Sequence, residues 1–453
     1  MRPGRRPALA TAAALLLAAL LAAAAPAHAE GLLQVLARAQ RDNPALRAAR
    51  AAYAAARTRV PAARAALLPQ LEADASLGMA TQHNGGNPLL QNFRLPTDWR
   101  YESRDLSLTA TQALWQPGAR LRVHVAEDDA QLAYVALLRA NQQLMIDVAA
   151  AYFERLAAQD ALDALQGQLD AVARQLASAR QQFAAGNGTI VDVRDAQARD
   201  DLLLAQRIAA RNRIALADDR LLQLSGARCT DPARLSALPR LPGPAGTLEQ
   251  WAARARREAL AVRAAQLRRD AARLQQRIAA SATQPVIDAY ARVEHAGTSG
   301  GSNLFPFGNR SDVGSVGVQL RWPLLTGGRA QADVDQTAQQ LAQTDDLLAA
   351  ARDDAGHAAR SAYLQLDADR ARVTALRAAL HSSAAALDAN RLGFQVGMRA
   401  SVDVLDALAQ RYEARRELDA ARYAVLLDGL RLREAAGTLR TADVREVDAL
   451  LRR

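Results

Sequence analysis

The stretch "GMRASVDVLDAL" at 397–408 holds the side chains whose types and spacing could most readily do chemistry. Asp403 and Asp406 follow Arg399 by four and seven residues. Side chains three residues apart share one face of a helix, so the two carboxylates would project together. Such a pair can act as a catalytic acid and base, ligate a metal ion, or form the acidic first turn of a helix.

The same frame occurs 211 positions earlier, as "GNGTIVDVRDAQ", with Asp192 and Asp195 at the places of the two later acids. A pattern used twice favours an ordinary helix start, in which an acid in the first turn complements the helix dipole. Ser401 is then the candidate N-cap of the later helix. A helix start does not explain why Arg399 takes the place of Gly188, so a special role for the later copy stays open.

Other catalytic and metal-binding patterns are missing from the sequence. It has no HExxH, CxxC or P-loop spacing, and its single cysteine is Cys229. Five histidines follow the first 29 residues, none of them paired at metal-ligand spacing: His83, His124, His295, His357 and His381. We therefore expect neither an enzyme nor a metal or cofactor site, and a lone thiol without a disulfide.

The first 29 residues have the pattern of a cleavable secretory signal. Basic "MRPGRRP" precedes apolar "ALATAAALLLAALLAAAA" and the small-residue site "PAHA". Cleavage after Ala29 would leave Glu30 first, with no Cys to carry a lipid. A helical membrane anchor is the alternative, but no later apolar run is long enough to cross a bilayer. The sequence therefore predicts an exported protein.

The basic charge of the chain comes entirely from arginine, because the sequence contains no lysine. The formal charge of +10 falls to +7 when Arg2, Arg5 and Arg6 leave with the signal. Arginine alternates with acids along helical stretches such as "RDAQARDDLLLAQR". This alternation is typical of solvated, salt-bridged helix faces rather than of a nucleic-acid surface.

An internal repeat organises the rest of the chain. Tyr152 matches Tyr363 and Gly226 matches Gly437 at the same offset of 211 positions. Between the copies lies the Pro-rich segment "CTDPARLSALPRLPGPAG". The predicted organisation is a signal peptide at 1–29, a first repeat at 30–226, a linker at 227–246, a second repeat at 247–437 and a C-terminal tail at 438–453.

Each copy is predicted to contain a helix, two strands, a very long helical run and a further helix. The long runs, 119–185 and 329–396, are rich in Ala, Leu, Gln, Arg and Asp and contain no Pro. At about 1.5 Å per residue, each could extend for roughly 100 Å. We expect an extended antiparallel helical bundle; the alternative is a turn near Gly167 that divides the first run into two ordinary helices.

Four runs alternate apolar and polar residues, as half-buried strands do: 71–79, 105–114, 287–294 and 316–322. Lengths near ten residues, with long polar loops inside each pair, suit strands of an outer-membrane barrel. The alternative is a soluble four-stranded sheet that caps the bundle. Four strands cannot close a barrel, and an open edge is not tolerated in lipid, so membrane strands would require oligomerisation.

With these features the chain resembles the outer-membrane efflux proteins of the TolC type, over nearly all of its length after the predicted signal. The resemblance rests on "ALLPQL" before a strand, "LWQPG" and "PLLTGGR" after strands, "AYF" and "AYL" in the long helices, and the two helix starts. It implies a mainly α fold with a small β part. Long antiparallel helices form an α-helical barrel, which a trimeric twelve-stranded transmembrane β-barrel continues, four strands coming from each chain.

The resemblance also implies a function. The homotrimer would be an exit duct in the cell outer membrane, surrounded by outer-membrane lipid, with its helical part in the periplasm. It would dock a periplasmic adaptor (membrane fusion) protein and an inner-membrane ABC or proton-driven transporter. The cargo would be a protein, in type I secretion, or small molecules, in efflux. A soluble periplasmic coiled-coil scaffold without a barrel is the competing hypothesis.

By the same resemblance, Asp403 and Asp406 would line the periplasmic constriction as carboxylate rings, with Asp195 adjacent. In a trimer each acid would meet two copies of itself across the pore. Like charges held close together raise the pKa of a carboxyl group and attract cations.

The resemblance further implies a latch, in which Arg399 pairs with Asp192 and holds the resting gate shut. Relatives often carry Tyr at the position of Phe394. Because Phe has no hydroxyl, one hydrogen bond of the gate is expected to be missing here.

Overall fold

The computed structural model describes residues 30–83, 98–229, 231–235, 243, 245–302, 305–306 and 308–452. The predicted signal and the centre of the polar loop between the first two predicted strands lie outside this range. The elements are α2 (Leu32–Asp42), α3 (Pro44–Ala65), β1 (Gln70–His83), β2 (Asp98–Trp115), α4 (Pro117–Ala184), α5 (Ile190–Ser225), β3 (Arg234–Leu235), α6 (Leu248–Glu258), α7 (Leu260–Ala280), η2 (Ser281–Thr283), β4 (Val286–Ser302), β5 (Phe305–Pro306), β6 (Asn309–Arg321), α8 (Arg329–Gln395), α9 (Ser401–Ala435), α10 (Thr441–Asp448) and β7 (Leu451–Arg452).

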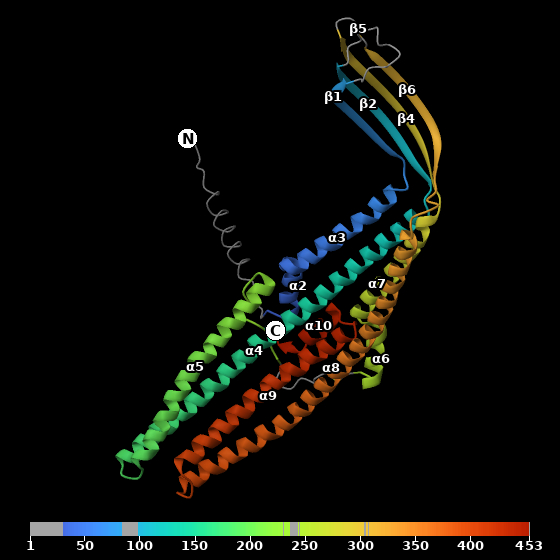
Figure 1. The fold of residues 1–453 in the computed structure, drawn as a ribbon. Helices are drawn as coiled ribbons and strands as arrows, with labels where there is room; N and C mark the ends of the chain where they lie inside the picture. The colour runs from blue at the N-terminus through green and yellow to red at the C-terminus, as the bar shows by residue number, and fades with distance from the viewer. Residues whose placement is uncertain are drawn as a thin grey trace, which may run out of the picture. The chain divides into compact units, whose positions relative to one another are not determined.

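The chain divides into two compact units, and each is described by itself. Unit 1 contains the described parts of Met1–Arg47, Asn141–Ala252 and Ala358–Arg453; unit 2 contains those of Ala48–Ala140 and Ala253–His357. In unit 1, α5 lies along the second part of α4, and α9 lies along the second part of α8 (Figure 1). Unit 2 holds the long strands together with α3, α7 and the first parts of the two long helices.

Each half of the chain begins with two short helices where the sequence predicted one. In the first half the break falls at Asn43, whose side-chain Oδ1 accepts hydrogen bonds from the backbone N–H groups of Ala45 (3.0 Å) and Leu46 (3.2 Å). Pro44 is the first residue of α3, where its missing N–H costs no helical hydrogen bond. These residues form an N-cap that apolar periodicity alone does not show.

The long helix α4 is unbroken at Gly167, so the alternative of two ordinary helices is wrong. A Cβ at Gly167 would lie 3.1 Å from the ring of Tyr412 on α9. The glycine therefore serves close helix packing rather than a turn. The two long helices contain 68 and 67 residues, which confirms the predicted uninterrupted runs.

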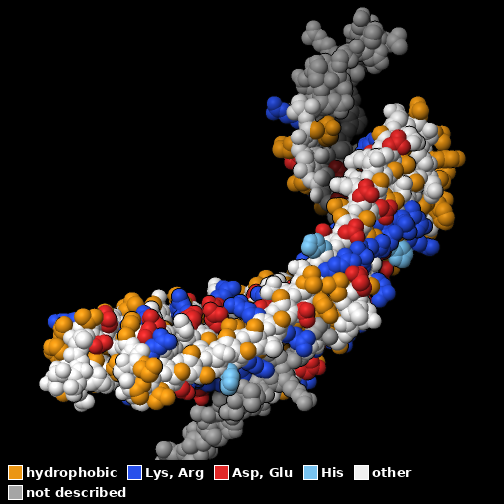
Figure 2. Space-filling model, turned by 90° about the horizontal axis from the view of Figure 1, so that it is seen from below, with side chains coloured by type: hydrophobic (Ala, Val, Ile, Leu, Met, Phe, Trp, Pro, Cys, Tyr) orange, Lys and Arg blue, Asp and Glu red, His pale blue; other side chains and the backbone are white. Residues whose placement is uncertain are grey.

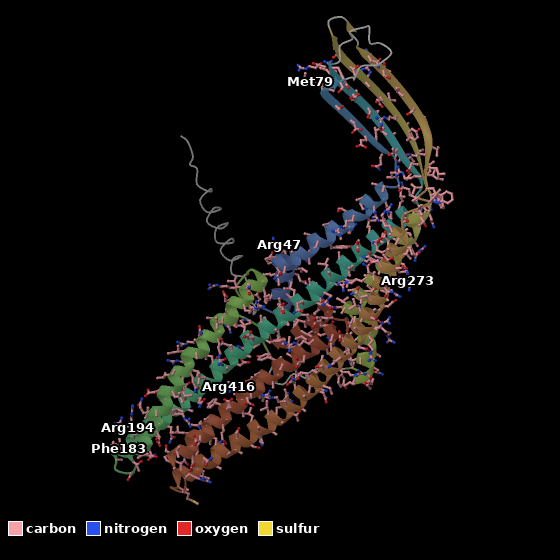
Figure 3. All side chains as sticks on the ribbon, viewed as in Figure 1. Arg47, Met79, Phe183, Arg194, Arg273 and Arg416 are labelled. Atoms are coloured by element: carbon pink, nitrogen blue, oxygen red, sulfur yellow. The ribbon has the colours of Figure 1, made fainter. Side chains whose placement is uncertain are left out.

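Unit 2 contains an antiparallel sheet in the order β1–β2–β4–β6. All four predicted strands are present, and they extend into segments that the sequence assigned to loops; β2 alone has 18 residues. The apolar residues of the predicted alternation lie on one face and are exposed in the single chain, among them Leu77, Met79, Leu108, Val316 and Val318 (Figure 3 labels Met79). This face has no protein cover within unit 2 of the described chain.

The described residues of the predicted linker and tail are parts of unit 1. Arg234 and Leu235 of the linker pair with Arg452 and Leu451 as a short antiparallel ladder. In α10, Val444 and Val447 are buried. The C-terminal segment therefore packs onto the helices instead of trailing from them.

Apolar clusters hold the helices of unit 1 together. One joins α6, α8 and α9 through buried Trp251, Leu366 and Val425. Between these contacts, charged side chains of both signs are interspersed over the helices (Figure 2), as the sequence pattern predicted. Among the described residues, no helix has a stretch apolar and long enough to traverse a bilayer.

Candidate functional site: two helix starts at the hairpin turns

The two candidate motifs lie at the turns that join α4 to α5 and α8 to α9, both in unit 1. Figure 3 labels Phe183 and Arg194 beside the first turn. Two residues after the end of each long helix stands a glycine with positive φ, Gly186 after α4 and Gly397 after α8, both at 75°. Only glycine adopts this backbone conformation without strain, which explains why both copies of the motif begin with glycine.

In the first copy, Asp192 is occupied in capping its own helix. The Thr189 hydroxyl oxygen accepts the backbone N–H of Asp192 (3.1 Å), and the Asp192 carboxylate accepts the Thr189 backbone N–H (3.3 Å). The same carboxylate also accepts the Thr189 hydroxyl (2.6 Å). This is a capping box, the helix-start role that the sequence suggested. Asp195 is exposed one turn later.

In the second copy, Ser401 is not the N-cap, contrary to the sequence expectation. It is the first helical residue and is buried, and its hydroxyl accepts a hydrogen bond from Gln175 Nε2 of α4 (3.1 Å). The cap position belongs to Ala400, whose side chain cannot accept a hydrogen bond. Asp403 reaches back instead and accepts the Ala400 backbone N–H (3.2 Å). The acid in the first turn is therefore the only side-chain cap that this helix start has among the described residues.

The two later acids lie on the face of α9 that packing leaves free. Val404 and Leu408 are buried in one apolar cluster with α4 and α8, and Leu405 is buried in a second cluster with α4 and α5. Asp403 and Asp406 alternate with these residues and remain partly exposed, at 38 % and 56 % of the side chain. The structure thus fixes the direction of both carboxylates through their apolar neighbours.

Each later acid has an arginine partner. Arg399 lies 3.8 Å from Asp403, within the same helix start. Asp406 pairs with Arg199 of α5, a contact between the two hairpins that the sequence reading missed. No local pattern pointed to this contact, because Arg199 and Asp406 stand 207 positions apart in the sequence.

The structure does not bring the predicted latch residues together within one chain. Among the described residues, the ion-pair partner of Arg399 is Asp403, and Asp192 is held by Thr189. Phe394 is partly buried against the apolar cluster of α9. Its ring is therefore a packing element, in keeping with the missing hydroxyl.

In each copy, a large residue packs against a glycine six positions away, but the order of the large residue and the glycine is reversed between the copies. A Cβ added to Gly393, in the last turn of α8, would lie 2.7 Å from Cγ of Arg399. In the first copy the matching positions are Gln182 and Gly188, and a Cβ at Gly188 would lie 3.0 Å from Cβ of Gln182. The large residue of each pair thus lies over the glycine. Because Gly393 has no side chain, the Arg399 stem can pack against the last turn of α8.

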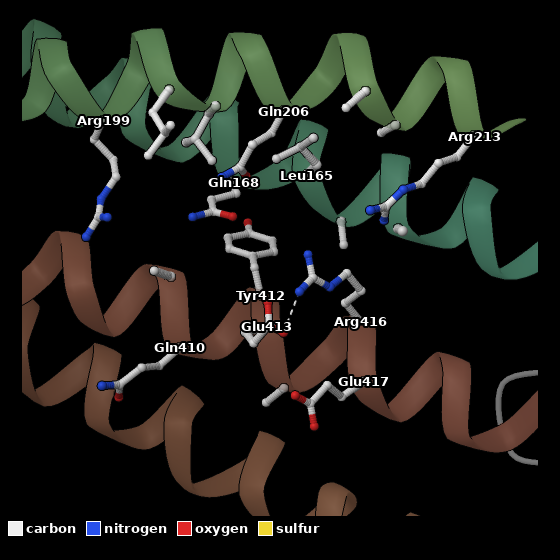
Figure 4. A pocket seen from close by; sticks show the side chains of 18 of the residues that line it. Leu165, Gln168, Arg199, Gln206, Arg213, Gln410, Tyr412, Glu413, Arg416 and Glu417 are labelled. Carbon is white, nitrogen blue, oxygen red and sulfur yellow. Dashed lines mark hydrogen bonds and ion pairs between the residues drawn. The ribbon is translucent and has the colours of Figure 1, made fainter.

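A groove opens farther along unit 1, between the α4–α5 hairpin and α9 (Figure 4). Its volume is about 750 Å³. The floor is apolar and rich in alanine, and the rim carries charged and polar side chains: Gln168, Arg199, Arg213, Tyr412, Glu413 and Arg416. Nowhere in the described chain do three or more His, Cys, Asp or Glu side chains gather in a way that could hold a metal ion.

The family "Outer membrane efflux protein" matches residues 35–227 and 251–438 of this sequence. The chain belongs to the outer membrane efflux protein family. This membership decides against the soluble scaffold and against an enzyme, because the family consists of passive outer-membrane channels. It also confirms the expected location, in the outer membrane with the helical part in the periplasm.

Individual relatives support the same assignment. The chain is 30 % identical to "Outer membrane protein TolC" of Vibrio cholerae, over 94 % of both chains. It is 29 % identical to "Alkaline protease secretion protein AprF" of Pseudomonas aeruginosa, over 93 % of this chain and 88 % of that one. Among solved structures, the Campylobacter jejuni CmeC outer membrane channel superposes with a TM-score of 0.76 at 15 % identity, over 93 % of this chain and 90 % of that one.

Proposed function

We propose that three copies of this chain form the exit duct of a tripartite export system. The observation that carries the proposal is the sheet of unit 2. Within the described chain, β1 pairs only with β2 and β6 pairs only with β4. The outer edge of each of these two strands is therefore unpaired. Its exposed apolar face suits lipid, where an unpaired edge would leave backbone groups without partners.

Closure must therefore come from other copies, with β6 of one chain beside β1 of the next. Two copies would supply eight strands and three copies twelve, and the family resemblance favours three. A soluble complex would need no such closure. Native mass spectrometry of the detergent-extracted protein should give a three-chain species. Membranes washed with high salt should retain it, and release by salt alone would contradict the proposal.

At the hairpin turns, we propose that Asp403 and Asp406 of the assembled trimer form the constriction. Both carboxylates point away from the apolar clusters that hold α9 and stay partly exposed beside their arginine partners, so they can face a pore. Replacing both by Asn should weaken cation selectivity, and block by divalent and trivalent cations, in planar bilayers. Asp388→Asn, at an exposed acid on α8, is the matched control. Unchanged selectivity in the double variant would remove these acids from the constriction.

We place the latch between copies, because Arg399 and Asp192 do not meet within one chain. Arg399 of one protomer would pair with Asp192 of the partner subunit and hold neighbouring hairpins together. Arg399→Ser should then raise the conductance. Exchanging the charges, with Arg399→Asp and Asp192→Arg combined, should restore a low value; an unaltered or tighter Arg399→Ser pore would refute the latch.

For partners, we propose that the groove between α5 and α9 receives a helical segment of the periplasmic adaptor. Its alanine floor permits close approach of a helix, and its rim, which carries charges of both signs, suits a helix with polar and charged side chains. Combining Arg213→Glu with Arg416→Glu should weaken binding of the adaptor, whereas Arg211→Glu, outside the groove, should not. For the cargo, the likeness to a protease secretion protein favours a protein exported by type I secretion. Co-expression with an ABC exporter and its substrate tests this assignment.

A further inference from the structure

The apolar face of the sheet ends in a row of charged side chains, and the register of the strands aligns them. On β2, Arg104 pairs with Gly297 of β4, and Gly297 in turn pairs with Arg310 of β6. Each of the three stands an even number of residues from an exposed apolar residue of its own strand, Leu106, Val293 or Val316, and therefore lies on the same apolar face. Two arginines thus flank a bare glycine on the apolar face.

The space above Gly297 is open. A Cβ built on this glycine would have one neighbour within 4 Å, the backbone oxygen of Arg104 at 4.0 Å. Adjacent strands lie about 4.8 Å apart, so the two arginine backbones are separated by roughly 10 Å. Long guanidinium side chains can converge across that distance onto one tetrahedral anion, with the glycine as the floor of the cradle.

The other groups around the cradle are polar or charged. His295, two residues before Gly297, contacts Asp312, which also lies 3.7 Å from Arg310. On the far side, Ser299 donates a hydrogen bond to Glu102 (3.5 Å), and Glu102 lies 3.2 Å from Arg104.

These ion pairs leave both guanidinium groups available. The Arg104 and Arg310 side chains are 66 % and 76 % exposed. Exposed ion pairs contribute little, so the guanidinium groups can turn to a stronger acceptor. Arg100, further along the same face of β2, adds a third guanidinium, so the arginines outnumber the two carboxylates.

The distance of this cradle from the other end of the apolar face fits a membrane. Gly297 lies ten residues along β4 from Ile287, which pairs with Trp115 at the end of β2. Ten residues span roughly 33 Å along a strand, or about 25 Å across a bilayer at the usual strand tilt. This equals the apolar band of outer-membrane barrels, with tryptophan at one boundary and the cradle at the other.

We propose that Arg104, Gly297 and Arg310 form a binding site for the phosphate of an anionic lipid headgroup, on the outer surface of the barrel at the end of its lipid-facing band. The proposal rests on the function proposed above, which places this face in lipid. Its chemistry is bidentate hydrogen bonding of guanidinium to phosphate, over a floor that only glycine leaves open.

The test fills the floor without touching the charges. Gly297→Val would block the cradle while suiting a strand. Gly314→Val on the same face, where a Cβ meets nothing within 4 Å, is the matched control. Arg104→Gln with Arg310→Gln removes the charges instead. Full-length protein is extracted in neutral detergent and shown to be a three-chain species. It is then titrated with micelles containing phosphatidylglycerol or phosphatidylcholine, and the melting temperature and retained lipids are recorded.

We expect wild type and Gly314→Val to bind phosphatidylglycerol about tenfold more tightly than phosphatidylcholine. Gly297→Val and the double glutamine variant should show no preference. Equal affinity of wild type for both lipids would overturn the proposal, and so would a full preference for phosphatidylglycerol in Gly297→Val. Competition by inorganic phosphate with the same affinity as the lipid would also overturn it. A normal three-chain species without lipid preference refutes this site alone, whereas loss of that species in wild type refutes the proposed function.

Discussion

Gly393→Ala tests the packing that seats Arg399. The glycine lies in the last turn of α8 with helical backbone, so alanine fits the conformation. In an open helix this substitution should stabilise each chain by about 1 kcal/mol. Here the new methyl group would lie 2.7 Å from Cγ of Arg399, a distance that side-chain atoms do not tolerate. The arginine stem must therefore move away from its turn.

The displacement offsets the gain in helix propensity. Arg399 would lose its exposed 3.8 Å pair with Asp403, worth about 0.2–1 kcal/mol, and its packing over the turn. Gly393→Ala should therefore be close to neutral while Arg399 is present. It should stabilise by about 1 kcal/mol in an Arg399→Ala background, which gives a coupling of roughly 0.5–1 kcal/mol in a double-mutant cycle.

Two measurements check this expectation. Chemical unfolding gives the cycle, and planar-bilayer conductance shows whether moving Arg399 opens the pore, as Arg399→Ser should. Gly429→Ala on α9 is the control, because a Cβ there meets nothing within 4 Å. If Gly393→Ala stabilises the Arg399 protein as much as Gly429→Ala does, with unchanged conductance, the packing argument is refuted.

Three further predictions concern burial and close packing in unit 1. Burial, followed by a hydrogen bond with Asp369, raises the pKa of Asp428 to about 6. The native chain then holds a proton that the unfolded chain has lost, so stability should fall by up to ~3 kcal/mol per chain as the pH rises from about 4 to about 6. Asp428→Asn should flatten this part of the melting-temperature profile, and an unchanged slope would contradict the assignment. Burial also raises the pKa of the Cys229 thiol to about 12, so a maleimide should label it at neutral pH only after unfolding. Labelling of the native protein would contradict that burial. Gly167→Val should lower the free energy of unfolding by about 1–3 kcal/mol, because its side chain would overlap the Tyr412 ring, and a melting temperature equal to wild type would count against this close packing.

Periodicity and composition predicted the elements of this fold well. Unbroken Ala-rich runs without proline gave the long helices, and alternation gave the four strands with their apolar face. The prediction of a single helix at the start of the chain failed where one side chain decides the outcome, because Asn43 divides that helix by capping α3. The unbroken run through Gly167 was predicted, but its packing against Tyr412 of α9 depends on a tertiary neighbour, which a local pattern does not contain.

For the candidate site, the sequence predicted the helix starts but not the long-range contacts of their side chains. Repetition correctly suggested that Asp192 and Asp403 stand in the first turns of two helices. It could not show that Ser401 is turned inward to Gln175, or that Asp406 meets Arg199 of another helix, because both contacts join residues about 200 positions apart. The resemblance assigned the roles of gate and latch, which depend on contacts between copies.

The central claim, a barrel closed by neighbouring copies, is tested most directly by cross-linking the two open strand edges. In a Cys229→Ser background, a cysteine at Ala75 of β1 is combined in turn with a cysteine at each position from Val313 to Gln319 of β6. Adjacent strands bring the right pair within disulfide distance. One register should yield a covalent species of three chains in outer membranes under oxidising conditions. Cross-linking in no register, or a species that ends at two chains, would contradict the account.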